Sequence, residues 1–168
     1  MIGTLIFDWG GTIMEDPGLP GPMYLWDEVS LVPGAGEALE ALSAEYSCWI
    51  ATGAGVSDGP MMRKALERVG VAGRFRGFFS PRELGYAKPD PEFFREVCRR
   101  AGAEPGACIM TGNDYAKDIA GAKAAGLRTI FFHKPGGEGN YPLADVLITR
   151  MQDLPGAVRR IATTKTET

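Results

Sequence analysis

The sequence has few of the residues on which several common kinds of site depend. His133 is its only histidine, so a serine–histidine–aspartate hydrolase is not indicated. Its three cysteines, Cys48, Cys98 and Cys108, are scattered and include no Cys-x-x-Cys pair. We therefore expect small, buried, reduced thiols in a cytoplasmic protein.

Neither a membrane nor a nucleic acid is expected as a partner. No apolar run is long enough to span a bilayer. The opening run, Ile2–Phe7, is too short for a secretory signal, and Asp8 follows it at once. The net charge of −3 lacks the basic excess of a dedicated nucleic-acid binder.

Short apolar runs alternate with helical patterns along the 168 residues, which fit one domain, 1–162, followed by a polar tail, 163–168. Buried strands alternating with helices predict an α/β fold, a doubly wound parallel sheet covered on both faces. The expected strands are Ile2–Phe7, Ser47–Ala51, Gly77–Ser80, Ala107–Thr111, Leu127–Phe132 and Val146–Ile148. The expected helices are Ala35–Glu45, Pro60–Val69, Pro91–Ala101, Asp118–Ala125 and Met151–Ile161.

One irregular segment, rich in glycine and proline, interrupts this alternation at about 14–32. We call it the flap, and expect it either to cover a site or to bind a partner. The charges of the following helix, among them Arg63, Lys64 and Arg68, are expected to form a solvated face.

The first polar motif, Asp8-Trp9-Gly10-Gly11-Thr12, comes directly after a buried strand. A carboxylate placed there can attack phosphorus and form an aspartyl phosphate. We expect Gly10, Gly11 and Thr12 to bind phosphate, because glycines let backbone N–H groups approach an anion closely. The ordinary alternative is that Asp8 caps a turn.

The second and third motifs offer groups that suit a phosphoryl oxygen. The hydroxyl of Thr52 and the backbone N–H of Gly53 follow another strand and could hold a phosphate oxygen, although Thr52 could equally cap the next turn. Lys88 lies in a proline-stiffened loop and would offset the charge of the nucleophile and the phosphoryl group. Its alternative is an exposed loop lysine. We class Asp8, Thr52 and Lys88 as the candidate catalytic residues.

The fourth motif, Gly112-Asn113-Asp114 with Asp118, adds oxygen ligands of the kind that Mg²⁺ prefers. Asp8, the carbonyl of Gly10 and one group of this loop could hold the metal. The choice between Asn113 and Asp114 is open. Asp118 is equally compatible with direct ligation and with orienting Lys88 and the loop.

These four motifs, in this order and at these intervals, resemble those of the haloacid dehalogenase-like (HAD) superfamily. The resemblance extends from Ile2 to the closing helix, and the stretch Asp118–Gly126 is especially typical. It implies a Rossmann-like doubly wound core, Mg²⁺ as cofactor, and hydrolysis of phosphate esters through an aspartyl intermediate as the commonest activity.

The sequence departs from the family at three points. Phosphatases of the family carry a second aspartate two residues after the nucleophile, but this chain has Gly10 there, which can neither protonate a leaving group nor activate water. The usual metal-binding aspartate of the fourth motif is replaced by Asn113. Only 39 residues separate Thr12 from Thr52, which leaves no room for a cap domain. Carboxylates that could replace the missing acid are Glu15, Asp16, Asp27 and Glu28.

Three functions fit these observations. The first is a Mg²⁺-dependent phosphatase that acts on a small phosphorylated substrate or on a phosphorylated macromolecule. The second is a dehalogenase- or phosphonatase-type hydrolase that attacks carbon, and the third is a degenerate domain that binds phosphate without turnover. Without a cap the site would be open, unless a partner subunit of a homodimer covers it.

Overall fold

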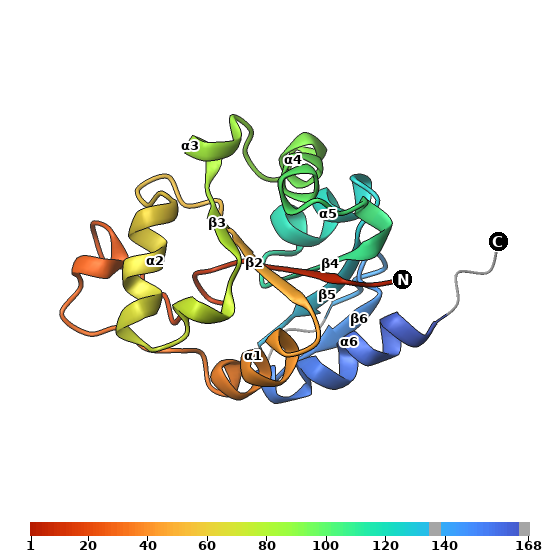
Figure 1. Ribbon diagram of the computed structural model, residues 1–168, viewed down its shortest axis with the longest axis horizontal. Coiled ribbons are helices and arrows are strands. Elements are labelled where there is room, and N and C mark those ends of the chain that lie inside the picture. Colours follow the sequence, from red (N-terminus) through yellow and green to blue (C-terminus); the bar gives the residue numbers. More distant parts are fainter. Residues whose placement is uncertain (135–138, 165–168) are drawn as a thin grey trace.

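The computed structural model describes residues 1–134 and 139–164, and in these residues six strands form one parallel sheet (Figure 1). The strand order is β3-β2-β1-β4-β5-β6, and every neighbouring pair runs parallel. The predicted doubly wound α/β sheet is therefore confirmed. The strands are β1 (Thr4–Phe7), β2 (Ser47–Ala51), β3 (Gly77–Phe79), β4 (Cys108–Gly112), β5 (Arg128–Phe132) and β6 (Val146–Ile148).

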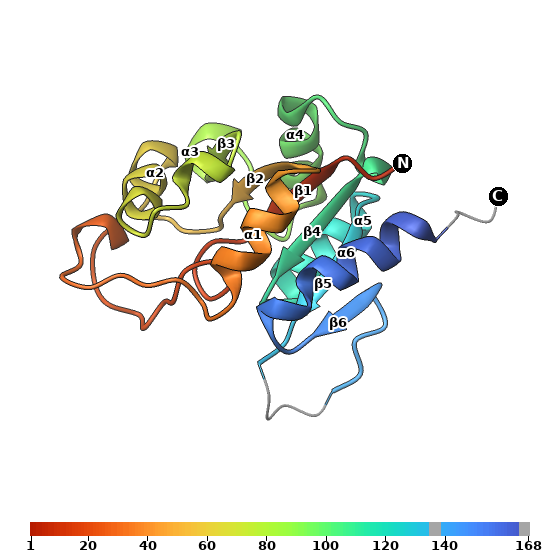
Figure 2. The ribbon, with the colours of Figure 1, turned by 60° about the horizontal axis from the view of Figure 1, so that its bottom comes forward.

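Helices cover both faces of this sheet, as Figures 1 and 2 show, with α1 and α6 on one side and α4 and α5 on the other. Successive side chains of β1 point to opposite faces, so Leu5 and Phe7 pack with α1, α2 and α6 whereas Ile6 packs with α4 and α5. The helices are α1 (Ala35–Ser43), α2 (Gly59–Arg68), α3 (Pro81–Leu84), α4 (Pro91–Ala101), α5 (Gly121–Ala124) and α6 (Leu154–Thr163).

The elements differ from the prediction mainly at their ends. The expected helix Asp118–Ala125 begins earlier, because a π-helical segment, Tyr115–Ala120, precedes α5. Helix α3 was not predicted, although the capping box of Ser80 and Glu83 is its sequence signal. Of the predicted tail, Thr163 ends α6, and residues 165–168 lie outside the described residues.

No separate cap domain is present in the described part of the chain, as expected. The flap contains only one short 3₁₀ turn, Met23–Leu25, and its ends are joined by a bridge between Met14 and Leu31. It lies beside α2 in both ribbon views (Figures 1 and 2). In the same part of the chain, no helix has the length and apolar character needed to cross a membrane.

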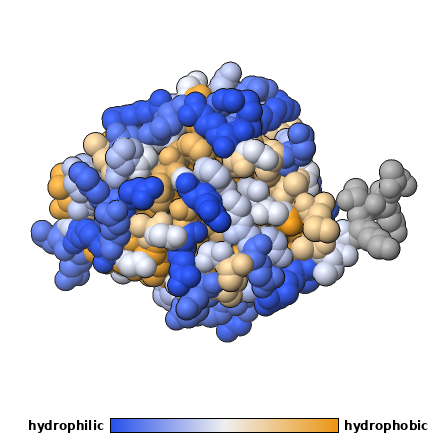
Figure 3. Space-filling model, viewed as in Figure 1, coloured by the Kyte–Doolittle hydropathy of each residue, from blue (hydrophilic) through white to orange (hydrophobic). Residues whose placement is uncertain are grey.

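Charged residues occupy the outer sides of the helices. On α4, for example, Arg99 and Arg100 both pair with Glu96, while Phe93 and Phe94 are fully buried. Figure 3 shows the result: the surface over α4, at the top of the view, is hydrophilic. The three cysteines are buried and free, in agreement with their prediction as small core residues.

Candidate active site

One cleft of about 500 Å³ lies beyond the carboxyl ends of the strands, where ligands of open parallel sheets bind. It brings together almost all the residues that the sequence singled out. Of the residues expected to be catalytic, to bind phosphate or to bind the metal, Gly11 and Thr12 alone do not line it. Its principal polar lining is Asp8, Gly10, Asp16, Thr52, Gly53, Lys88, Asn113, Asp114, Lys117 and Asp118.

A lysine between two carboxylates forms the floor of the cleft. The Nζ atom of Lys88 donates to Oδ1 of Asp8 at 2.9 Å and to Oδ1 of Asp118 at 2.7 Å. The Lys88 side chain is only 1% exposed, so the alternative of an exposed loop lysine is wrong. Burial alone would lower the pKa of Lys88, but the two carboxylates outweigh it and hold this pKa above its usual value. The ammonium therefore stays charged beside Asp8.

Asp118 has a hydrogen-bond donor at each carboxylate oxygen. Lys88 binds Oδ1, and the backbone N–H of Asp114 donates to Oδ2 at 3.0 Å. Burial raises the pKa of Asp118 to about 6, although Lys88 opposes the shift, and Asp8 adds to it because two carboxylates share one cation. Gly112 accommodates this packing, since a Cβ there would lie 2.3 Å from Oδ2. The geometry corresponds to orienting Lys88 and the loop.

The turn after Asp8 uses some of its backbone N–H groups internally. Gly11 N donates to Met14 O, and Thr12 N donates to Trp9 O. The hydroxyl of Thr12 is buried and donates to Oδ1 of Asn113 at 3.2 Å. These groups are not directed at the cleft, which corrects the expectation that Gly11 and Thr12 bind phosphate.

Two other amides of the same turn remain available. The N–H groups of Trp9 and Gly10 have no hydrogen-bond partner among residues 1–134 and 139–164, and both residues line the cleft. Trp9 was not predicted to belong to the site, because only the glycines were expected to present backbone N–H groups to an anion. The signal that could have found it is its place, directly after the candidate nucleophile at the end of β1.

Thr52 lies beside Lys88 at the end of β2. Its side chain is buried, and its Oγ1 accepts a hydrogen bond from the N–H of Ala54 at 3.0 Å. Because Oγ1 is the acceptor in this bond, the hydroxyl proton remains free to donate into the cleft. Thr52 thus caps the following turn, which was the alternative role expected for it, and its hydroxyl can still donate to an anion.

The fourth motif adds two further oxygen-bearing residues to the lining of the cleft. Asn113 accepts the Thr12 hydroxyl, and Asp114 caps the following segment by accepting the N–H of Lys117 at 2.9 Å. Within the described ranges, no three His, Cys, Asp or Glu side chains are grouped so that they could hold a metal. His133 is not in the cleft and stacks on Phe131.

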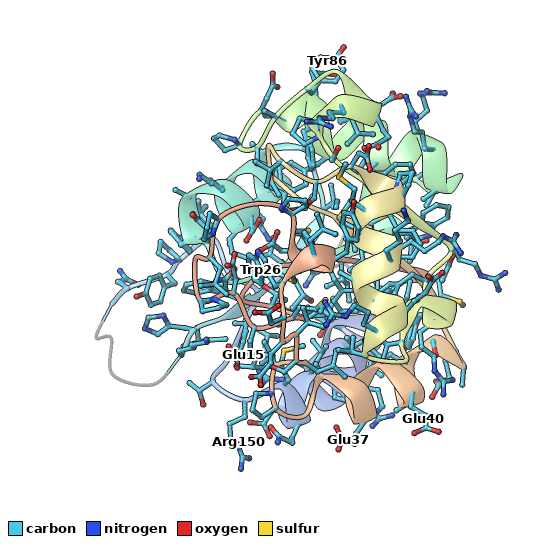
Figure 4. All side chains as sticks on the ribbon, turned by 90° about the vertical axis from the view of Figure 1, so that its left-hand side faces the viewer. Glu15, Trp26, Glu37, Glu40, Tyr86 and Arg150 are labelled. Carbon is cyan, nitrogen blue, oxygen red and sulfur yellow. The ribbon has the colours of Figure 1, made fainter. Side chains whose placement is uncertain are left out.

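The flap contributes residues to the lining of the cleft, among them Trp26, which Figure 4 labels beside the 3₁₀ turn of the flap. Arg68 of α2 fastens it, because its guanidinium donates to the carbonyls of Tyr24, Trp26 and Asp27 at 3.1, 2.5 and 2.9 Å. The expectation that the charges of α2 form a purely solvated face is therefore wrong for Arg68. The three carbonyls come from an irregular segment that no periodic pattern could have placed there.

Comparison with known proteins gives a consistent result. A model of the haloacid dehalogenase-like hydrolase family matches residues 18–126, which include Thr52, Lys88 and Asp118 but not Asp8. A ribulose-1,5-bisphosphate 5-phosphatase of Halopiger xanaduensis is 35% identical over 63% of this chain and 44% of its own length. The chain spans about half the length of the curated relatives it matches.

Solved structures share the fold. An uncharacterised protein of Listeria monocytogenes serotype 4b superposes with a TM-score of 0.86 at 22% identity, covering 97% of this chain and all of its own. A HAD hydrolase of Bacillus subtilis solved with magnesium bound gives a TM-score of 0.76 at 18% identity, covering 94% of this chain and 98% of its own.

Proposed function

Because the chain belongs to the haloacid dehalogenase-like hydrolase family, we propose that it is a Mg²⁺-dependent phosphatase with Asp8 as nucleophile. The observation that carries this proposal is the position of Lys88 between Asp8 and Asp118 on the floor of the cleft. The Lys88 ammonium holds one oxygen of Asp8 by a charged hydrogen bond and would offset the charge of the phosphoryl group that Asp8 attacks.

The residues around Asp8 suit a phosphoryl group with oxygens on several sides. The Lys88 ammonium and the Thr52 hydroxyl can donate to one side, and the free amides of Trp9 and Gly10 to another. Donors fixed in place before the reaction stabilise charge that develops on the phosphoryl oxygens. Asp118, engaged at both oxygens, acts as the residue that positions Lys88.

The chemistry of the donor set fits Mg²⁺. Asp8 has one oxygen, Oδ2, without a hydrogen-bond partner in the described structure, and the Gly10 carbonyl and Asn113 or Asp114 lie in the same cleft. Mg²⁺ is commonly bound through one or two carboxylates, substrate phosphate and several waters, so a set this small suffices. When bound, the ion would neutralise charge on the transferred phosphoryl group.

A small phosphorylated substrate suits the size of the cleft. A volume of about 500 Å³ lies within the range of sites for small molecules. The relatives named for sugar-phosphate hydrolysis point to the same class. A phosphorylated macromolecule remains the alternative, because residues 1–134 and 139–164 form no cap domain over the site.

The other two functions are less well supported by the cleft. Attack on carbon by a phosphonatase route would use a lysine over the site, but the flap contains none. A metal-free dehalogenase needs a covered apolar pocket, whereas this cleft has two lysines, three aspartates and an asparagine in its lining beside Asp8. A domain that only binds phosphate would hydrolyse no substrate, so an activity assay distinguishes it from a phosphatase.

The test is phosphate release from p-nitrophenyl phosphate and a panel of phosphorylated metabolites, with Mg²⁺ and with EDTA. We expect activity that requires Mg²⁺ and falls by about a thousandfold or more in Asp8→Asn, which loses the nucleophile. Folded protein that releases no phosphate from any substrate, but binds inorganic phosphate, would support the binding-only function instead.

A further inference from the structure

We propose that Asp16, at the start of the flap, supplies the proton-transfer carboxyl group that position 10 lacks. This inference rests on the proposed phosphatase function and adds a catalytic residue to it. Its basis is that the Asp16 carboxylate lies in the space that a side chain at position 10 would enter.

The overlap between the two positions is close. A Cβ built on Gly10 would lie 2.8 Å from Oδ2 of Asp16 and 3.3 Å from its Cβ. The backbone of Gly10 is not in the left-handed region, so the Asp16 side chain, rather than backbone strain, excludes a larger residue there. Gly10 and Asp16 are therefore complementary, since the absent side chain of one makes room for the other.

The turn after Asp8 explains how the chain returns to this point. A bridge joins Gly10 to Met14, and a second bridge joins Met14 to Leu31 at the far end of the flap. The N–H of Glu15 adds a hydrogen bond to the carbonyl of Ser30 at 2.9 Å. These backbone contacts reverse the chain and fix the residue that follows, Asp16, above Gly10.

The Asp16 side chain is oriented but not fully used. Its Oδ1 accepts the N–H of Gly18 at 2.9 Å, which holds the carboxylate in one position. Its Oδ2, the atom nearest Gly10, has no hydrogen-bond partner in the ranges the structure describes, and the residue lines the cleft together with Asp8. One oxygen is thus anchored and the other is available for proton transfer.

The remaining carboxylates near the site are placed for other tasks. Asp114 caps Lys117, and Asp118 holds Lys88. Glu15 pairs with Lys134 at 3.5 Å. The flap residues Asp27 and Glu28 do not line the cleft. They line a second, adjoining cavity, which shares Asp16 and Leu19 with the cleft. Among the four carboxylates that the sequence offered as replacements, the structure places only Asp16 in the cleft.

The proton transfers balance over two steps. In the first, Asp8 attacks phosphorus, the bond to the leaving oxygen breaks, and protonated Asp16 gives its proton to that oxygen. In the second, the Asp16 carboxylate takes a proton from water as the water oxygen attacks phosphorus, and the bond to Asp8 breaks. Inorganic phosphate leaves, and Asp8 and Asp16 each hold the same number of protons as before the first step.

Asp16→Asn tests the proposal with p-nitrophenyl phosphate, whose leaving group needs little protonation. We expect the variant to release about one nitrophenolate per enzyme in a burst and then to turn over about 10²–10⁴-fold more slowly, because water activation is lost. Intact-mass measurement should detect one phosphoryl group on the protein during that slow phase. The matched control, Asp27→Asn, removes a flap carboxylate outside the cleft and should retain the wild-type rate.

A rescue experiment separates catalysis from support of the flap. Gly10→Asp in the Asp16→Ala background places a carboxyl group from the opposite side of the same space and should recover at least about tenfold over Asp16→Ala alone. Recovery without a gain in thermal stability would support proton transfer. A failure to recover in a folded double variant, or an Asp16→Asn turnover within about threefold of wild type, would overturn the proposal.

The proposed function and the role of Asp16 fail in different ways. Wild-type protein that hydrolyses nothing overturns the phosphatase function itself. Wild-type activity that needs Asp8 but survives Asp16→Asn overturns only the role of Asp16. A loss in Asp16→Asn without a burst or trapped phosphoryl group would also count against it, because both steps would then be slowed together.

Discussion

The ammonium of Lys88 lies 2.7 Å from Oδ1 of Asp118, and neither side chain is more than 2% exposed. Asp118 lines the cleft, but its other oxygen accepts the N–H of Asp114. Asp118 therefore supports Lys88, which in turn contacts Asp8. Removing the Asp118 carboxylate should affect both stability and turnover.

Asp118→Ala should lower the free energy of unfolding by about 3–5 kcal/mol, because it leaves the Lys88 charge buried with one partner fewer. Asp118→Asn should cost less, since an amide oxygen can still accept from Lys88 and ionising the buried carboxyl is itself unfavourable. Urea denaturation of the two variants checks this order. If both variants unfold at the wild-type urea concentration, Asp118 does not support Lys88 in this way.

Asp145 should stabilise the protein only above acidic pH. It joins β5 to α5, because Lys123 donates to its Oδ1 at 2.7 Å and the N–H of Thr129 to its Oδ2 at 2.8 Å. Burial alone would raise the pKa of Asp145, but these donors outweigh it and hold the pKa below its usual range. The stabilisation is thus complete above the pKa of the unfolded chain, about 3.9, and is lost as the pH falls through the lower folded value.

Asp145→Asn should accordingly cost about 1–2 kcal/mol at neutral pH and progressively less below about pH 4. Denaturant unfolding of wild type and variant across that range measures the difference. Asp153→Asn is a control, because Asp153 pairs with exposed Arg150 and should show a small effect at every pH. An equal Asp145→Asn cost at neutral and acidic pH would contradict the linkage.

Arg68→Ala should release the flap from α2. The guanidinium holds three flap carbonyls, and an alanine leaves all three without that donor. We expect faster proteolysis within 14–32 and a stability loss of about 1–2 kcal/mol. Arg63→Ala is the matched control on the same helix, since Arg63 lies over Phe78 and not against the flap. If both variants are cleaved alike, Arg68 is not what fastens the flap.

Periodicity and strand-end motifs were sufficient to predict the sheet and most of the polar residues that line the cleft at the strand ends. The apolar runs of β1, β2 and β4 are short, buried and followed by polar residues, and parallel strands bring such residues together at one edge. The prediction needed no knowledge of loop paths, because a parallel sheet fixes where its strands end.

What sequence reasoning missed depends on loop paths. The amides of Gly11 and Thr12 turn inward because the chain reverses after Trp9, and only the bridges to Met14 and Leu31 reveal it. The same reversal of the chain brings Asp16 into the cleft. The sequence alone could not separate Asp16 from the three other candidate carboxylates of the flap. Arg68 was predicted to be a solvated surface charge. Its partners are backbone carbonyls, which every residue has, so the residue types of the flap could not indicate the contact.

Asn113→Asp should increase the affinity of the proposed site for Mg²⁺. Asn113 lines the cleft with Asp8 and offers a neutral carbonyl where a second carboxylate would add charge attraction for a hard cation. The hydroxyl of Thr12 can still donate to an aspartate there, so the link between the two motifs is kept. We expect at least about a tenfold tighter dissociation constant by calorimetry with Mg²⁺ alone.

The matched comparison is Asp114→Asn, which removes the neighbouring carboxylate and leaves Asn113 unchanged. A weaker affinity in Asp114→Asn together with a tighter one in Asn113→Asp would mean that both side chains face the ion. An effect of only one substitution would identify that position as the ligand, because a residue that merely caps Lys117 changes stability without changing the dissociation constant. Unchanged Mg²⁺ affinity in both variants would place the ion on Asp8 and backbone carbonyls alone and would contradict the part proposed for this loop.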